Sequence, residues 1–336
     1  MKTPIAGLLP EEINQQSGFR QRFRGIQIFK SIHSNLLDFD SFTTIPKKTR
    51  KDLKNSLRIL TSKITKKLED HDSTIKLQIE LDDRTIIETV LLNDEKGRKT
   101  ACISTQAGCG MGCVFCKTGE MGFLRNLHAH EIVEQFIHLK SITDKISNIV
   151  FMGMGEPLAN YKNLKTAIKI FSHPAGPGIS CRKQTISTCG LTSGIKKMAD
   201  ENLKTKLAVS LNSADPEKRK CIMPVAEREP LDSLKKALNY YQKNTKNRIT
   251  LEYVLLRRIN DRKEDILFLK KFIAGLKVIV NIIPLNKYKG TSFNRPGSTR
   301  TRWFIAELKK NGILVSQRMR RGEGINGACG QLGETV

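Results

Sequence analysis

The sequence has no long apolar run and few aromatic side chains. None of its segments approaches the roughly 18 consecutive apolar residues of a membrane-spanning helix, so we expect no membrane partner. The first residues form a poor secretory signal, because Pro4 and Pro10 interrupt a short apolar stretch. Aromatic residues make up only 6% of the chain, which argues against an extended stacking platform for single-stranded nucleic acid. These absences predict a cytoplasmic protein.

Acidic residues are also few relative to basic ones. The chain has 58 Lys and Arg against 33 Asp and Glu, a formal net charge of +25. Residues 1–70 hold fourteen basic and seven acidic residues, and residues 287–321 hold ten basic residues and one acid, Glu307. A solvated basic surface explains part of such a pattern. An excess of this size nevertheless favours a polyanionic partner, and nucleic acid is the preferred hypothesis.

Neither a glycine-rich phosphate loop nor a dinucleotide-binding fingerprint follows the first predicted core strand. From about residue 98, short apolar runs alternate about six times with longer amphipathic stretches. We therefore predict an α/β core over residues 98–336, in which a parallel sheet with outer helices is either doubly wound or curved into a full or partial barrel. We expect a basic helical accessory domain over residues 1–72, suited to nucleic acid and later assigned to RNA binding, and a β-hairpin or linker over residues 73–97 before it.

Glycines and polar residues lie at the ends of several predicted strands. In both kinds of α/β fold, functional residues gather at the carboxyl ends of the strands. The candidates at these positions are Gly155, Glu156, Ser187, Ser210, Asn212 and Asn286.

Three of the eight cysteines lie in "CGMGCVFC", as Cys109, Cys113 and Cys116. No fourth cysteine or histidine lies in this loop, and His128 and His130 fall on the next predicted helix. A structural zinc site usually needs four protein ligands, whereas a [4Fe-4S] cluster gives each iron its own ligand and can leave one iron open. The incomplete set favours the cluster. A zinc-containing RNA-binding protein without catalysis is the alternative of another class.

The other five cysteines are scattered along the chain. Taken singly, Cys102, Cys181, Cys189 and Cys221 are interpreted as small buried hydrophobic residues, and Cys329 as a packed or idle residue near the C-terminus.

The cysteine loop, placed after the first strand of a repeated strand–helix domain, resembles that of the radical S-adenosylmethionine (SAM) enzymes. The resemblance implies a partial (β/α)6 TIM-like barrel and a [4Fe-4S] cluster on Cys109, Cys113 and Cys116. It also implies that the amino and carboxylate groups of SAM chelate the open iron, and that SAM then supplies a 5′-deoxyadenosyl radical. Phe115 matches the aromatic residue that contacts the adenine of SAM.

Further motifs resemble the RlmN/Cfr family of adenosine methyltransferases. They are "MGMGEPLAN", "TISTCG", "LAVSLNS", "IPLN" and "ACGQL", in this order, and the resemblance covers nearly the whole chain from "FRQRFRGIQIFKSIH" onward. It implies that Glu156 pairs with the ammonium group of SAM. The residues that it implies for SAM binding are Gly155, Glu156, Ser187, Ser210, Leu211, Asn212 and Asn286.

The same resemblance implies three further roles. Cys329, in "ACGQL", accepts a methyl group from one SAM and becomes S-methylcysteine, and a radical from a second SAM activates that methyl for addition to an adenine ring. Cys102 then attacks Cys329 and releases the transient protein–RNA crosslink as a disulfide, while Glu88 is the base that removes the ring proton. Radical addition suits an sp² C–H carbon, and a second thiol is needed because the carbon stays tethered to sulfur.

The family acts on an adenosine of 23S rRNA near the peptidyl-transferase centre, and its RlmN-type members also act on the adenosine 3′ of the tRNA anticodon. Pro157 after Glu156 resembles the RlmN type, which methylates C2, so we expect C2 methylation, with Cfr-type C8 methylation as the alternative. The expected partners are both RNAs and a flavodoxin or ferredoxin as electron donor, with the chain as a monomer.

The basic N-terminal helices and the segment 287–321, with Arg318, Arg320 and Arg321, are the candidate RNA contacts. In the C-terminal loop, Gly324 and Asn326 stand where the commoner family version carries aspartates, so we expect this loop to hydrogen-bond differently.

Overall fold

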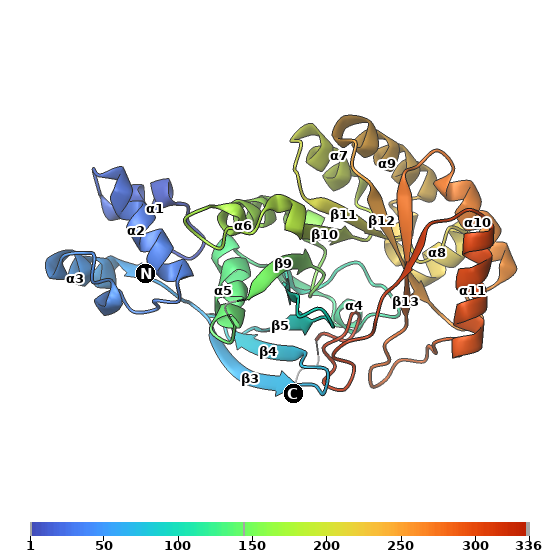
Figure 1. Ribbon diagram of the computed structural model, residues 1–336, viewed down its shortest axis with the longest axis horizontal. Helices are drawn as coiled ribbons and strands as arrows, with labels where there is room; N and C mark the ends of the chain where they lie inside the picture. Colours follow the sequence, from blue (N-terminus) through green and yellow to red (C-terminus); the bar gives the residue numbers. More distant parts are fainter. Residues whose placement is uncertain (1, 144, 334–336) are drawn as a thin grey trace.

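A ten-stranded sheet forms the centre of the computed structural model, which describes residues 2–143 and 145–333 (Figure 1). The spatial order of its strands is β14-β13-β12-β11-β10-β9-β6-β5-β4-β3. Along the chain these strands are β3 (Lys63–Glu69), β4 (Ile75–Glu80), β5 (Ile86–Asn93), β6 (Lys99–Cys102), β9 (Ile146–Phe151), β10 (Gln184–Thr188), β11 (Lys206–Ser210), β12 (Ile249–Leu255), β13 (Val278–Pro284) and β14 (Val315–Gln317).

The strands from β6 to β14 in this sheet pair in parallel. Parallel neighbours need a crossover, and helices supply it. In α9, for example, Leu234, Leu238 and Tyr241 are buried at helical spacing. The predicted α/β core is thus confirmed. Its principal helices are α5 (Ala129–Lys140), α6 (Tyr161–Ser172), α7 (Thr192–Asp200), α8 (Pro216–Ile222), α9 (Leu231–Thr245), α10 (Lys263–Ile273) and α11 (Ser298–Lys310).

The predicted hairpin around Asp82 and Asp83 consists of β4 and β5, which pair antiparallel. It continues the core sheet, because β5 also pairs antiparallel with β6, where Val90 lies opposite Cys102. Strand β3 is added at the outer edge by pairing with β4. The sequence had indicated a helix for this segment, and that expectation was wrong. Its lysines fit an edge strand, where charge discourages pairing with another chain.

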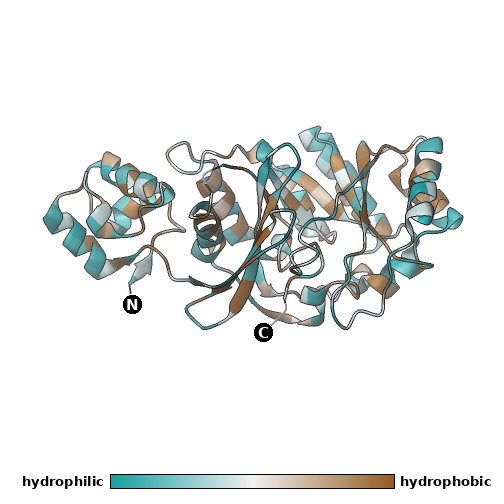
Figure 2. Cartoon of the chain, turned by 60° about the horizontal axis from the view of Figure 1, so that its bottom comes forward, coloured by the Kyte–Doolittle hydropathy of each residue, from teal (hydrophilic) through white to brown (hydrophobic). Residues whose placement is uncertain are grey.

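Three helices near the N-terminus lie at one end of the longest axis of the molecule (Figure 1). They are α1 (Pro10–Ser17), α2 (Arg22–His33) and α3 (Lys47–Ser56), and the short strands β1 (Thr3–Pro4) and β2 (Leu57–Arg58) pair in parallel beside them. Many residues of these helices are hydrophilic, while those of the central strands are largely hydrophobic (Figure 2). The helical character of the N-terminal segment agrees with the sequence. The domain boundaries at residues 72 and 97 stay predictions.

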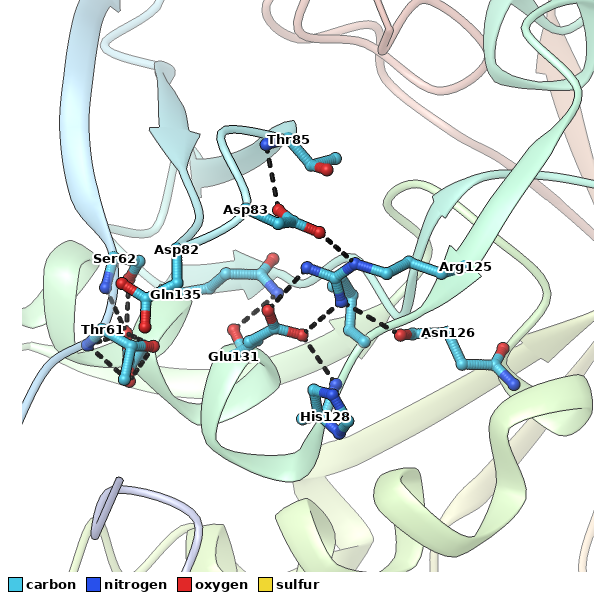
Figure 3. A network of polar contacts seen from close by, with 12 residues as sticks. Thr61, Ser62, Asp82, Asp83, Thr85, Arg125, Asn126, His128, Glu131 and Gln135 are labelled. Atoms are coloured by element: carbon cyan, nitrogen blue, oxygen red, sulfur yellow. Dashed lines mark hydrogen bonds and ion pairs between the residues drawn. The ribbon is translucent and has the colours of Figure 1, made fainter. Parts of the chain in front are cut away.

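A short antiparallel ribbon holds the cysteine loop at both ends. It consists of β7 (Gln106–Gly108) and β8 (Phe123–Asn126), and the loop between them includes α4 (Lys117–Glu120). Arg125 in β8 donates to Asp83 at 2.6 Å and to Glu131 in α5 at 2.8 Å (Figure 3). The guanidinium is bidentate to the Glu131 carboxylate, and these two hydrogen bonds offset the cost of its partial burial. The ribbon is therefore tied to both the hairpin turn and the first core helix.

Across the described residues, no helix is both long and apolar enough to cross a membrane. The remaining short helical turns are η1 (Phe39–Ser41), η2 (Pro157–Asn160), η3 (Cys181–Lys183) and η4 (Pro224–Glu227).

Candidate active site

One cavity lies where the parallel strands of the core end. The structure brings to this cavity most of the side chains that the sequence singled out, from four different strand ends and two loops. The predicted residues that line it are Cys109, Cys113, Cys116, Phe115, Gly155, Glu156, Ser187, Ser210, Asn212, Asn286 and Cys329.

The three loop cysteines line this cavity together. Burial raises the pKa of the Cys109 thiol to about 12, and burial likewise raises the pKa of Cys113 and Cys116. Within the described residues, no set of three His, Cys, Asp or Glu side chains is arranged around a single ion position. Thiolates that each bind a different iron of a cubane do not need to surround one point. The donor set therefore fits a cluster with one open iron.

Gly155 and Glu156 form the turn after β9. Gly155 has a φ of +96°, and a Cβ there would lie 2.4 Å from Cβ of Gln106, so only glycine fits. The backbone N–H of Glu156 donates to Oε1 of Gln106 at 2.7 Å. Its carboxylate accepts from the N–H groups of Leu158 at 3.0 Å and Cys189 at 2.7 Å. Burial nevertheless raises the pKa of Glu156. The carboxylate is thus held rigidly at the cavity wall.

Asn286, just after β13, has a side-chain amide in which the nitrogen is hydrogen-bonded and the oxygen is free to accept from a ligand. Its Nδ2 donates to the carbonyl oxygen of Cys329 at 3.1 Å. Its Oδ1 is buried and has no hydrogen-bond partner in the described part of the chain. Because an unsatisfied buried acceptor is costly, this oxygen fits a donor group such as an ammonium or ribose hydroxyl of a bound nucleoside.

Asn212 and Leu211 contribute mainly to the shape of the strand end. Asn212 adopts a φ of +55°, and its Oδ1 accepts from the N–H of Val254 at 2.9 Å. Leu211 is fully buried, and its carbonyl accepts from the guanidinium of Arg219. Leu211 does not line the cavity, so any contact with a ligand there needs its backbone.

Cys102 and Cys329 meet in a small pocket beside the main cavity, and Arg318 lines that pocket with them. Cys102, at the end of β6, is buried, and this burial raises its pKa to about 12, although the nearby charge of Arg318 opposes the shift. Cys329 is an exposed residue that lines both the pocket and the main cavity. The two thiols that the sequence placed 227 positions apart therefore share one pocket beside the cluster loop.

Glu88 lies outside both the main cavity and the thiol pocket. On β5, it forms an ion pair with Lys76 at 3.0 Å, and both side chains are only 2% exposed. Its other oxygen accepts from the backbone N–H of Gly333 at 2.8 Å. Glu88 lines neither the main cavity nor the thiol pocket. A role as base therefore requires movement of the C-terminal segment that covers it.

Two residues of the site were missed or misplaced from sequence. Glu252 is an acid inside the apolar run "ITLEYVLL", and it lines the main cavity while accepting from Asn281 at 2.7 Å. The lone acid in a buried strand was the signal that should have revealed it. Arg318 had been grouped with surface arginines for RNA. Its side chain instead lines the cavity and the thiol pocket, because its N–H is fixed to Ile282 next to the barrel interior.

Arg320 and Arg321 also line the thiol pocket, and they pair with Glu323 at 2.6 Å and Glu95 at 3.8 Å. His130 lies in the first turn of α5, as the sequence predicted, whereas His128 is the N-cap residue just before the helix. Neither histidine lines the cavity.

Comparison with known proteins places this geometry in a family. The sequence model of the Radical SAM superfamily matches residues 103–269. The chain is 47% identical, over all of its length and 96% of the other, to a probable dual-specificity RNA methyltransferase RlmN of Treponema denticola. It is 39% identical, over 98% of both chains, to a ribosomal RNA large subunit methyltransferase N of Nitrosopumilus maritimus.

A solved structure is similar over the same extent. It is the crystal structure of a radical SAM methyltransferase from Sphaerobacter thermophilus, which matches with a TM-score of 0.94 and 35% identity over 98% of this chain and 99% of that one. Radical SAM enzymes use SAM and a [4Fe-4S] cluster, and the three thiols and the unpaired Asn286 oxygen fit these groups. The chain therefore belongs to the RlmN family of radical SAM methyltransferases.

Proposed function

We propose that this enzyme methylates C2 of an adenosine in 23S rRNA and of the adenosine 3′ of the tRNA anticodon. The observation that carries the proposal is the shared pocket of Cys102 and Cys329, which opens beside the cavity of the three loop cysteines. Direct methyl transfer to a nucleophile needs no thiol pair. A route through carbon bound to sulfur needs both thiols, and they must be able to meet.

The loop cysteines and the cavity residues hold the cofactors in this proposal. Cys109, Cys113 and Cys116 bind three irons of the cluster, and Glu156 and Asn286 bind SAM through its ammonium group and a further donor. The cofactors supply a methyl group and, from a second SAM, the means to abstract a hydrogen atom from it.

Cys329 carries the methyl group in this proposal. As a thiolate it takes the methyl carbon and becomes a thioether. After this carbon has lost one hydrogen atom it bonds to C2 of the adenine, the hydrogen of C2 leaves as a proton, and the one electron in excess would return to the iron–sulfur cluster. Cys102 then attacks the sulfur of Cys329, so that an S–S bond forms while the C–S bond breaks. The carbon leaves with the electron pair and gains a proton to become the product methyl group. A cellular thiol must then reduce the disulfide before the next turnover.

Glu88 is the proposed base that removes the proton from C2. In the structure both of its oxygens are engaged, one by Lys76 and one by the N–H of Gly333. We infer that the base acts only after the C-terminal segment has shifted, so that proton removal follows attachment of the adenine to Cys329.

The net positive charge of the chain and one surface of α2 both suit an RNA partner. There Phe23 is half exposed, and the guanidinium of Arg24 lies over its ring at 4.8 Å. An exposed aromatic ring beside arginines can stack a base while the arginines contact phosphates. Pro157, which begins η2 directly after Glu156, supports the C2 position through its likeness to RlmN-type members. We further propose a flavodoxin or ferredoxin as electron donor and a monomeric enzyme in the cytoplasm.

Anaerobic reconstitution followed by mass mapping of the product tests this function. Protein with iron and sulfide, incubated with SAM, reductant and RNA, should form 2-methyladenosine in both RNAs. Formation of 8-methyladenosine would instead assign the Cfr-type reaction. One zinc per chain without any cleavage of SAM would favour a non-catalytic RNA-binding protein and contradict the proposal.

A further inference from the structure

The loop that carries Cys329 is fixed to the antiparallel extension of the sheet. Its first part hydrogen-bonds to the turn between β3 and β4. The N–H of Gly322 donates to Oδ2 of Asp72 at 3.0 Å, and the N–H of Gly324 donates to Oδ2 of Asp70 at 3.0 Å. Hydrogen bonds from backbone N–H groups to ionised carboxylates are among the stronger kinds. This part of the loop is therefore anchored 5 to 7 residues before Cys329.

Lys76, at the start of β4, extends the same anchor toward the thiol. Its ammonium group donates to the carbonyl oxygen of Asn326 at 3.1 Å while it pairs with Glu88 at 3.0 Å. Glu88 in turn accepts from the N–H of Gly333 at 2.8 Å. One buried ion pair thus contacts the chain three residues before Cys329 and four residues after it. The reactive thiol lies in the middle of a segment clamped at both ends.

The two turn carboxylates are suited to this task by their own surroundings. Burial by itself would raise the pKa of Asp72, but hydrogen bonds from Thr74 and from the N–H of Gly322 outweigh it and lower the pKa. Asp70 uses Oδ1 for His71, whose backbone N–H donates at 2.8 Å, so its Oδ2 is left for Gly324. Both carboxylates are thus also held by hydrogen bonds within the turn itself.

We propose that Asp70, Asp72 and Lys76 are positioning residues that hold the Cys329 loop against the cavity. This inference rests on the proposed role of Cys329 and extends it to the β3–β4 turn, far from the cluster in the chain. Loss of the Asp70 and Asp72 contacts should leave the cluster and the SAM pocket intact, because neither side chain lines the cavity. What changes is how long the thiol stays in reach of the groups it must meet.

Gly324 belongs to the same anchor between the Cys329 loop and the β3–β4 turn. A Cβ at this position would lie 2.8 Å from Oδ1 of Asp70, so an aspartate there would meet a like charge at close range. An aspartate at position 324 would therefore require the Asp70 carboxylate to move away from the loop. We infer that Gly324 allows the backbone N–H to take the place of a side chain as the partner of the turn.

Thiol alkylation, read residue by residue by mass spectrometry, tests the anchor on the cluster-loaded enzyme. Cys221 in α8 is exposed and serves as an internal reference. In the double variant D70A/D72A, alkylation of Cys329 relative to Cys221 should rise at least about fivefold, because two charge-assisted hydrogen bonds are lost. The matched variant D70N keeps an acceptor oxygen and should stay near the wild type. Equal Cys329 reactivity in D70A/D72A and wild type would overturn the proposal.

The expected interaction between position 324 and Asp70 gives a second, independent readout. G324D should accelerate alkylation of Cys329 much more in the native chain than in the D70A background, because the repulsion needs both carboxylates. Additive effects of the two substitutions would overturn the account of Gly324. Neither measurement requires methyl transfer. If the alkylation contrasts appear and no methylated RNA forms, the anchor stands and the proposed function fails.

In the same variants, the ratio of 5′-deoxyadenosine released to methyl groups transferred reports on positioning. D70A/D72A should raise this ratio, since SAM cleavage proceeds while the thiol is out of place. D70N should leave the ratio at its wild-type value, whereas an unchanged ratio in D70A/D72A contradicts a positioning role.

Discussion

Lys76 and Glu88 form an ion pair of 3.0 Å in which both side chains are almost completely buried, and through Gly333 and Asn326 this pair holds the segment that carries Cys329. Each charge has left water, and each has further hydrogen bonds, with Gln78 also donating to Glu88 at 3.3 Å. A buried pair of this kind costs desolvation that only intact partners offset.

Replacement of Lys76 by methionine is therefore predicted to destabilise the fold by about 3–5 kcal/mol, because Glu88 is left buried without its counter-charge. The double variant K76M/E88Q should recover a large part of that loss, since no uncompensated charge remains. Urea denaturation of the three proteins measures the difference. Equal stability of K76M and K76M/E88Q would show that the energetic cost of burying the Glu88 carboxylate does not depend on the charge of Lys76.

Gly155 should tolerate no side chain. In G155A the new Cβ meets Gln106 at 2.4 Å at a φ of +96°, so the turn that presents Glu156 must shift, and we expect loss of SAM binding. Gly178 provides the matched control, because its φ is +65° and nothing lies within 4 Å of an added Cβ. G178A should cost only about 1–2 kcal/mol of backbone strain and bind SAM normally. Titration with SAM under anaerobic conditions compares the two, and normal binding by G155A contradicts the geometry.

Arg318 should set the pH at which Cys102 works. Burial raises the pKa of this thiol to about 12 and Arg318 opposes that rise, so the thiolate fraction increases with pH throughout the neutral range. R318M removes the opposing charge and should move the pH dependence of crosslink release to higher pH, with R318K closer to the wild type. The rate of release is measured on the isolated protein–RNA adduct between neutral and alkaline pH. If the pH dependence of crosslink release is the same in R318M as in the wild type, this electrostatic role is excluded.

The surface of α2 should supply part of the RNA affinity. Charge reversal in R22E/R24E is predicted to weaken binding of tRNA and to reduce the slope of log affinity against log salt by about 1 or 2, because fewer counterions are released. The control K236E/K243E makes the same charge change at exposed positions of α9. Affinity measured at several salt concentrations separates the two surfaces. An equal loss in both variants would point to net charge alone.

Much of the core was predictable because its signals are local. Apolar runs that end in glycine or polar residues specify strands and their carboxyl ends, which is why Glu156 and Asn286 were found. The edge strand β3 was mistaken for a helix because its lysine-rich sequence has little local strand signal and becomes a strand by pairing with β4. The placement of Arg318 beside Cys102 depends on the closing of the sheet, so no sequence pattern near either residue contains it.

The hydrogen-bond partners of the C-terminal loop were likewise not predictable from the sequence. The departures at Gly324 and Asn326 were visible in the sequence. Their hydrogen-bond partners, Asp70 and Lys76, lie about 250 positions away and come close only through the antiparallel strands added to the barrel.

Trapping of the protein–RNA crosslink tests the central claim most directly, namely that Cys329 carries the methyl carbon and Cys102 releases it. In anaerobic turnover with SAM, reductant and RNA, C102A should accumulate a covalent adduct through Cys329, resolved by denaturing electrophoresis and mapped by mass spectrometry. C329A should form neither adduct nor methyladenosine. Normal turnover by C102A or C329A would contradict the account.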